Sequence, residues 1–87
     1  MGWQVRLAAS ARKRLERAPP RDRDRLASAL GEMEADPWTG DIVHLRGQPT
    51  AWRRRVGDWR ILFDILEQDG VVLVADIRRR TSTTYRR

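Results

Sequence analysis

The stretch over residues 52–65, WRRRVGDWRILFDI, constrains the fold of this chain more than any other. Two runs that alternate apolar and charged residues flank Gly57-Asp58, and two-residue loops that begin with glycine favour the type II′ turn of an antiparallel hairpin. Such a turn pairs Val56 with Trp59 and, further along, Trp52 with Phe63. The sequence therefore predicts two hairpin strands, over residues 51–57 and 59–67.

This pairing assigns the hairpin side chains to two faces of a sheet, because paired residues share a face and successive residues alternate. The predicted apolar face carries Trp52, Val56, Trp59, Ile61, Phe63 and Ile65, and the predicted basic face carries Arg53, Arg55 and Arg60. Arg54 falls on the apolar face, and we expect its guanidinium to reach solvent along the methylene stem. A sheet face that carries several guanidinium groups predicts an anionic ligand.

A second hairpin is predicted after this one, with Gln68-Asp69-Gly70 as a three-residue loop and Gly70 in the left-handed conformation. The expected pairs are Glu67 with Val71, Ile65 with Leu73, Phe63 with Ala75, Ile61 with Ile77, Leu62 with Asp76 and Arg60 with Arg78. A two-residue loop would instead place Asp76 opposite Phe63 and bury a carboxylate. The preferred register puts Arg78, and by parity Arg80, on the basic face.

The rest of the chain predicts one further strand at the start, two helices and an edge strand. The elements expected before the hairpins are a strand over 3–7, a helix over 10–18 with Ser10 as N-cap, a helix from Pro20 that stops before Asp36-Pro37, and an edge strand over 42–45. The predicted fold is α+β: an N-terminal strand, a two-helix hairpin and an antiparallel sheet of about four strands. The helices should cover the apolar face.

The composition is strongly basic, with 18 Lys plus Arg against 12 Asp plus Glu. Every one of these cations except Lys13 is arginine, which indicates nucleic acid or an acidic protein as partner. A genome rich in G and C would also raise the number of arginines, but it would not explain their clustering. A chain of 87 residues predicts one domain, over residues 1–87.

Several classes of protein are disfavoured by the sequence. Without cysteine there is no disulfide framework and no Cys-based zinc site, and the single histidine, His44, argues against a His-rich metal site. We expect neither a metal nor a cofactor. Apolar runs stay well below the roughly 20 residues of a membrane span, and no signal-peptide pattern opens the chain. The expected location is the cytoplasm.

Three motifs stand out once the strands are placed: Leu45-Arg46-Gly47, the run from Val56 to Phe63, and Ile77-Arg78-Arg79-Arg80 followed by Tyr85. Together with the Asp36-Pro37 helix stop and the order of elements, they resemble the RelE/ParE superfamily of type II toxins over nearly the whole chain. The resemblance implies a small toxin that is neutralised by a co-expressed antitoxin. RelE-type members cleave mRNA in the ribosomal A site, whereas ParE-type members act on DNA gyrase.

The resemblance also implies a site. The implied catalytic residues are Arg53, Arg55, Arg60, Arg80 and Tyr85, and the residues predicted to bind RNA are Arg54, Arg78, Arg79 and Arg86. The late arginine of the family matches Arg79 or Arg80, and parity favours Arg80. Tyr85 matches a terminal tyrosine that would stack on a base or position the nucleophile. The alternative for Arg60 is a structural ion pair with Asp64 or Asp76, and the four tryptophans are expected in the core or at its rim.

The chain departs from the family at Arg53 and Arg55, where the resemblance implies lysines. Cleavage of RNA by its own 2′-hydroxyl needs a proton acceptor, cations around the phosphate and an acid for the leaving oxygen. Arginine stays protonated at any relevant pH, so it can hold a phosphate but cannot easily accept this proton. The candidates for the base are Tyr85, Asp64, Asp76 and His44.

Three functions follow from these observations. The leading hypothesis is a metal-independent, ribosome-dependent mRNA endoribonuclease, because the basic face and Tyr85 are both present. The second is a ParE-like DNA gyrase inhibitor without nuclease activity, although such members generally lack the full basic set. The third is an inactive module that binds RNA or an antitoxin. The expected partners are a cognate antitoxin, the ribosome and mRNA.

Overall fold

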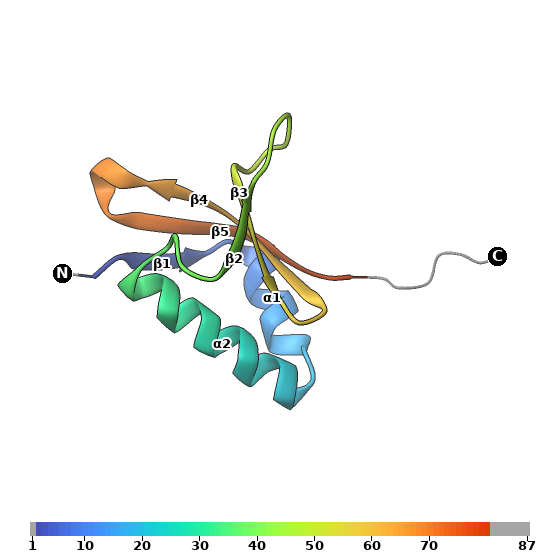
Figure 1. Ribbon diagram of the computed structural model, residues 1–87. Helices are drawn as coiled ribbons and strands as arrows, with labels where there is room; N and C mark the ends of the chain where they lie inside the picture. Colours follow the sequence, from blue (N-terminus) through green and yellow to red (C-terminus); the bar gives the residue numbers. More distant parts are fainter. Residues whose placement is uncertain (1, 81–87) are drawn as a thin grey trace.

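Two helices cover one face of a mixed five-stranded sheet and leave the other face open (Figure 1). The computed structural model describes residues 2–80. Its elements are β1 (Gln4–Leu7), α1 (Ala9–Arg17), α2 (Pro20–Ala35), β2 (Asp41–His44), β3 (Trp52–Val56), β4 (Trp59–Leu66), a 3₁₀ turn (Glu67–Asp69) and β5 (Val71–Arg79). The strand order is β1-β5-β4-β3-β2, in which β1 runs parallel to β5 and the other neighbours are antiparallel. The predicted α+β class is confirmed, and the N-terminal strand joins the later four as the fifth.

Proline sets the end of α1 and the start of α2. The residue before Pro19, Ala18, is extended with φ −67° and ψ 148°, as the ring of a following proline requires. Pro20 occupies the first turn of α2, where its missing N–H costs no hydrogen bond. The predicted cap was wrong: Ala8 is the N-cap of α1, and the Ser10 hydroxyl instead donates to the carbonyl of Ala75 at 3.0 Å. No helix among residues 2–80 is long and apolar enough to cross a bilayer.

The hairpin of β3 and β4 has the predicted register. Its pairs are Trp52–Phe63, Arg53–Leu62, Arg54–Ile61, Arg55–Arg60 and Val56–Trp59. Gly57 opens the two-residue turn with φ +59°, the left-handed conformation that glycine adopts without strain. The alternating pattern of residues 52–65 therefore fixes which arginines face the helices and which face away.

The hairpin of β4 and β5 differs from the prediction by one residue near its loop. The 3₁₀ turn and Gly70 make a four-residue connection, so Leu66 pairs with Val71 and Phe63 pairs with Val74. Gly70 has φ +65°, as predicted. A β-bulge then leaves Ala75 without a partner on β4 and restores the predicted pairs Leu62–Asp76, Ile61–Ile77 and Arg60–Arg78.

The core lies between the helices and the sheet. Its largest fully buried side chains are Phe63, Leu26, Met33, Ile61, Ile77, Val72, Val74 and Pro37. Because of the bulge, Val72 and Val74 take the core positions predicted for Leu73 and Ala75, and Leu73 is exposed. The tryptophans largely follow the prediction: Trp59 is buried, Trp3 and Trp52 pack against the core, and the exposed Trp38 lies edge-on to Trp3.

Candidate functional site

The face of the sheet that points away from the helices carries rows of side chains across the strands. One row places Arg55, Arg60 and Arg78 side by side on β3, β4 and β5. The next row, two residues along each of β3, β4 and β5, places Arg53 beside Leu62 and Leu62 beside Asp76. The register alone thus gathers four guanidinium groups on this open face.

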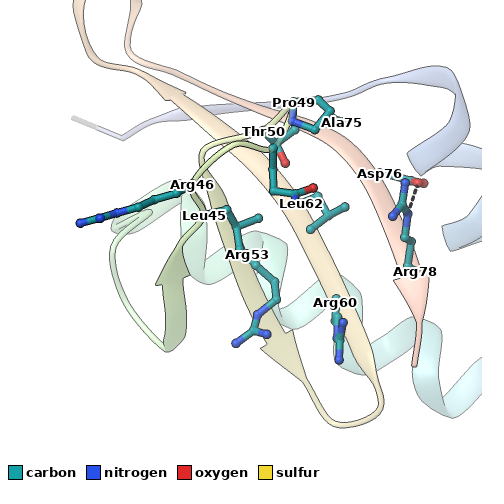
Figure 2. A pocket seen from close by; sticks show the side chains of 11 residues that line it. Leu45, Arg46, Pro49, Thr50, Arg53, Arg60, Leu62, Ala75, Asp76 and Arg78 are labelled. Atoms are coloured by element: carbon teal, nitrogen blue, oxygen red, sulfur yellow. Dashed lines mark hydrogen bonds and ion pairs between the residues drawn. The ribbon is translucent and has the colours of Figure 1, made fainter. Parts of the chain in front are cut away.

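A cavity of about 550 Å³ opens on this face between the sheet and the loop that joins β2 to β3 (Figure 2). Its lining residues are Leu45, Arg46, Gln48, Pro49, Thr50, Arg53, Arg60, Leu62, Ala75, Asp76 and Arg78. Arg53 and Arg60 extend side by side from neighbouring strands at one end of the cavity, and Pro49 and Thr50 lie at the other end (Figure 2). The cavity therefore has a cationic end and a loop-covered end.

Arg53 and Arg60 lack partners for part of their guanidinium groups. The Nε atoms of both are buried, and within residues 2–80 neither atom has a hydrogen-bond partner. Neither side chain forms an ion pair within the described part of the chain, so the structural pairing of Arg60 with Asp64 or Asp76 does not occur there. A buried charged donor without an acceptor is destabilising, and an anionic oxygen would satisfy it. The two side chains are thus arranged for an anionic ligand.

The carboxylates near the site accept hydrogen bonds from other parts of the fold. Asp64 accepts a hydrogen bond from the Ala51 N–H at 2.7 Å, which fastens the end of the β2–β3 loop to β4. Asp76 accepts from the Arg78 Nε at 2.8 Å and from the Ile77 N–H at 2.9 Å. Both were candidates for the general base, and both have structural roles in this arrangement.

His44, the third of these candidates, lies on the other side of the sheet. It is the cross-strand neighbour of Trp52, which belongs to the helix face, and the two rings meet edge-on with centroids 4.9 Å apart. The histidine is therefore separated from Arg60 by the sheet. Tyr85, the remaining candidate, and Arg86, predicted to bind RNA, lie outside the described residues.

The guanidinium of Arg54 was predicted to reach solvent, but it is buried. Its side chain lies on the helix face and is 7% exposed, with the guanidinium paired to Glu32 of α2 and hydrogen-bonded to the carbonyl of Ala29 at 3.3 Å. The loop before β2 crosses it closely, since a Cβ at Gly40 would lie 2.7 Å from the Arg54 Nε. The prediction that Arg54 binds RNA is wrong for this structure, because α2 supplies the acceptors that the sequence pattern did not reveal.

Arg79 is also directed toward the helices. Its cross-strand neighbour is Trp59, and its guanidinium carbon lies 5.5 Å from the centre of the Trp59 ring. The Nη2 atom of Arg79 lies 3.8 Å from a carboxylate oxygen of Asp22. The predicted RNA-binding role of Arg79 therefore does not fit its place. Arg80 follows β5, where its N–H donates to the carbonyl of Asp58 at 2.6 Å, and strand parity assigns it to the face of Arg78.

Arg55 and Arg46 differ in their place relative to the cavity. Arg55 is exposed on the open face as predicted, but it does not line the cavity. Arg46 lines the cavity from the β2–β3 loop, and Figure 2 shows its side chain extending away from the other arginines. The sequence analysis did not assign Arg46 to the site, although it stands in the Leu45-Arg46-Gly47 motif.

The comparisons with known proteins agree with this architecture. A family model described as the ParE toxin of the type II toxin-antitoxin system parDE matches residues 5–83. No curated protein matches the chain in sequence.

Among solved structures, the archaeal RelE–RelB complex from Pyrococcus horikoshii is similar at a TM-score of 0.80 and 22% identity, covering 95% of this chain and 100% of that one. The RelBE2 toxin-antitoxin complex from Mycobacterium tuberculosis is similar at a TM-score of 0.77 and 25% identity, covering 92% and 100%. The isolated RelE toxin from E. coli is similar at a TM-score of 0.79 and 18% identity, covering 94% and 88%.

Proposed function

The chain belongs to the ParE toxin family of type II toxin-antitoxin systems, within the RelE/ParE superfamily, and we propose that it cuts mRNA on the ribosome, as the RelE-type members of that superfamily do. The observation that carries the proposal is that the Arg53 and Arg60 side chains line one cavity and form no ion pair among residues 2–80, where their buried Nε atoms also lack a partner. A phosphodiester fits this cavity, because its non-bridging oxygens accept from guanidinium groups.

The proposed reaction is attack of the 2′-oxygen of RNA on its neighbouring phosphorus. The bond from phosphorus to the 5′-oxygen breaks, which yields a 2′,3′-cyclic phosphate and a 5′-hydroxyl end. Arg53 and Arg60 would donate to the phosphate oxygens as negative charge builds in the transition state, and Arg78 would approach from β5. The proton of the 2′-hydroxyl needs an acceptor, and the leaving 5′-oxygen needs a proton donor. Tyr85, which lies outside the described residues, stays a candidate for the acceptor.

The test is to map the 5′ ends of mRNA after brief induction of the protein. Cuts in phase with codons, together with cleavage on programmed ribosomes by the purified protein, are the expected result. The Arg60→Ala variant should leave the message whole. Intact mRNA after incubation of the wild-type protein with translating ribosomes would refute the proposal.

A second candidate function is inhibition of DNA gyrase without nuclease activity. Two observations favour it: the matching family model is that of ParE toxins, and the candidate bases have other contacts, since Asp64 and Asp76 accept hydrogen bonds within the fold and His44 packs on Trp52 on the helix face. A supercoiling assay with purified gyrase separates the candidates, since inhibition by both the wild-type protein and the Arg60→Ala variant would favour this function over cleavage.

A type II toxin has an antitoxin partner, and the similar proteins from Pyrococcus horikoshii and Mycobacterium tuberculosis are in toxin-antitoxin complexes. For this chain we expect an acidic or amphipathic segment to wrap the helices and the sheet, because the net charge is +6. Co-purification with the product of the adjacent gene checks this expectation, and a complex that persists at low salt but dissociates at high salt would support the electrostatic part.

A further inference from the structure

The open-face cavity changes character from one end to the other. Arg53, Arg60 and Arg78 surround one end, whereas the remainder carries the apolar side chains of Leu45, Pro49, Leu62 and Ala75 together with Arg46, Gln48, Thr50 and Asp76. Leu62 is half-buried at the centre of the sheet, between Arg53 on β3 and Asp76 on β5. Figure 2 shows the apolar residues directly beside the arginines, toward the β2–β3 loop. An anion alone would use only the cationic end.

The cationic end and the apolar end of the cavity are separated by about the distance between the phosphate and the base of one nucleotide. Arg60 and Leu62 point to the same face and stand two residues apart on β4, hence about 7 Å along the strand. This separation is comparable to that between the phosphate and the base of a nucleotide. A volume of about 550 Å³ also falls in the range of cavities that enclose a small organic ligand.

The wall over the apolar end is fixed in place by hydrogen bonds. The Leu45 N–H donates to the carbonyl of Ala51 at 2.7 Å and closes the base of the loop, while Asp64 accepts from the Ala51 N–H. Thr50 is 8% exposed, so the loop is packed down at the cavity. A wall that is ordered before a ligand arrives loses little entropy when the ligand binds.

We propose that the space between the β2–β3 loop and the surface of Leu62 and Ala75 is a nucleobase subsite, which holds the base of the nucleotide whose phosphate the arginines bind. The proposal rests on the proposed RNA cleavage and names the part of the substrate that the cavity recognises. Leu62 and Pro49 supply apolar surface for the base. Thr50 and Gln48 supply a hydroxyl and an amide that can hydrogen-bond to the base edge. These residues would set the nucleotide preference.

The experiment compares two probes that differ by the base. Adenosine 5′-monophosphate and ribose 5-phosphate are titrated into the ¹⁵N-labelled full chain, with amide chemical shifts as the readout. The nucleotide should bind about tenfold tighter, the gain that corresponds to burying roughly 55 Å² of apolar surface of the base. The amide chemical shifts that change on adding adenosine 5′-monophosphate should include those of Thr50 and Ala75. The shifts that change on adding ribose 5-phosphate should be confined to residues near the arginines.

Variants distinguish the two ends. Leu62→Ala should lower nucleotide affinity toward that of ribose 5-phosphate and leave ribose 5-phosphate binding unchanged. Leu73→Ala is the matched control, because Leu73 is exposed on the same face of β5 and does not line the cavity. Pro49→Ala changes an exposed loop residue, so it keeps the test valid if Leu62→Ala fails to fold.

Three outcomes decide the proposal. Equal affinity for the two probes would overturn the subsite and leave the arginine site standing. Equal losses for both probes in Leu62→Ala would also overturn it, since the change would then act on the whole face. Base-dependent binding that is lost in Leu62→Ala supports the subsite, even if mRNA on ribosomes stays intact, a result that would refute the proposed cleavage alone.

Discussion

Arg53 and Arg54 are neighbours on one strand and have opposite roles. Arg54 is buried under α2, where its Nη atoms have Glu32 and the Ala29 carbonyl as acceptors. Arg53 lies on the open face and forms no ion pair within residues 2–80, and the buried Nε atoms of both arginines lack a partner there. Strand pleating alone separates them, because successive side chains point to opposite faces. Arg54 is held by acceptors of α2, whereas Arg53 is left for the phosphate of the proposed function.

Two neighbouring arginines on β5, Arg78 and Arg79, also lie on opposite faces of the sheet. Arg78 lies on the open face beside Asp76, and Arg79 lies on the helix face between Trp59 and Asp22. A guanidinium group is therefore not by itself a sign of function in this protein. Both arginines have a carboxylate partner, so on β5 the face of the sheet separates the structural arginine from the one proposed to bind RNA.

The largest expected effect is that of Arg60→Ala, which removes an open-face donor. We expect mRNA cleavage on programmed ribosomes to fall about 10²- to 10³-fold, as for the loss of one donor that stabilises a transition state. Urea unfolding should show little change in the free energy of unfolding, since no side-chain hydrogen bond of Nε and no ion pair within residues 2–80 is broken. Arg55→Ala, on the same face but outside the cavity, should lose less activity. Equal losses in both variants would contradict the special role of the cavity.

Asp64 offers a way to separate a structural carboxylate from a base. Asp64→Asn keeps an oxygen that can accept from the Ala51 N–H, so cleavage should remain close to wild type. Asp64→Ala should lower the free energy of unfolding by about 1.5 kcal/mol, the low end for a hydrogen bond to a charged group, because the bond is only part-buried. A cleavage rate in Asp64→Asn as low as in Arg60→Ala would show that Asp64 accepts the proton.

Glu32→Ala tests the helix-face half of the comparison. It leaves the buried Arg54 guanidinium without its carboxylate, and we expect a loss of about 1 kcal/mol in urea unfolding. The loss is modest because 61% of the Glu32 side chain is exposed. Glu34→Ala on the same helix, whose side chain forms no ion pair within residues 2–80, is the control. Cleavage by folded Glu32→Ala should be unchanged, and a large loss of activity at full stability would contradict this division of roles.

The smallest effects come from the pair on β5. Arg79→Ala should cost about 0.2–1 kcal/mol of stability, as exposed ion pairs do, and should not change cleavage. Arg78→Ala should instead weaken RNA binding, with little effect on urea unfolding, because 62% of the Arg78 side chain is exposed and Asp76 keeps Arg14 as a partner. An Arg79→Ala variant that loses RNA binding while Arg78→Ala keeps it would reverse the assignment of faces.

The two hairpins differ in how well the sequence predicts them. The alternation around Gly57 leaves a single register for β3 and β4 that keeps apolar residues on one side, and the structure adopts it. Near Gly70 the connection is one residue longer than predicted, and the bulge at Ala75 shifts β5 back by one residue. The predicted and the observed register of β5 therefore have the same pairs beyond the bulge. An alternating pattern has no feature that marks a bulged residue. The prediction was therefore right at Arg78 and wrong at Leu73.

The sequence by itself determined the α+β class, the boundaries of α2 at two prolines, and the open-face positions of Arg53, Arg55, Arg60 and Arg78. These features depend on local geometry, because proline fixes the helix ends and pleating fixes the faces. Only the tertiary structure decided which arginines have acceptors, since Glu32 and Asp22 come from a helix distant in sequence. It also placed the β2–β3 loop over the sheet and so made the cavity. Burial and pairing depend on contacts between separate elements, and the periodicity of a single strand does not record them.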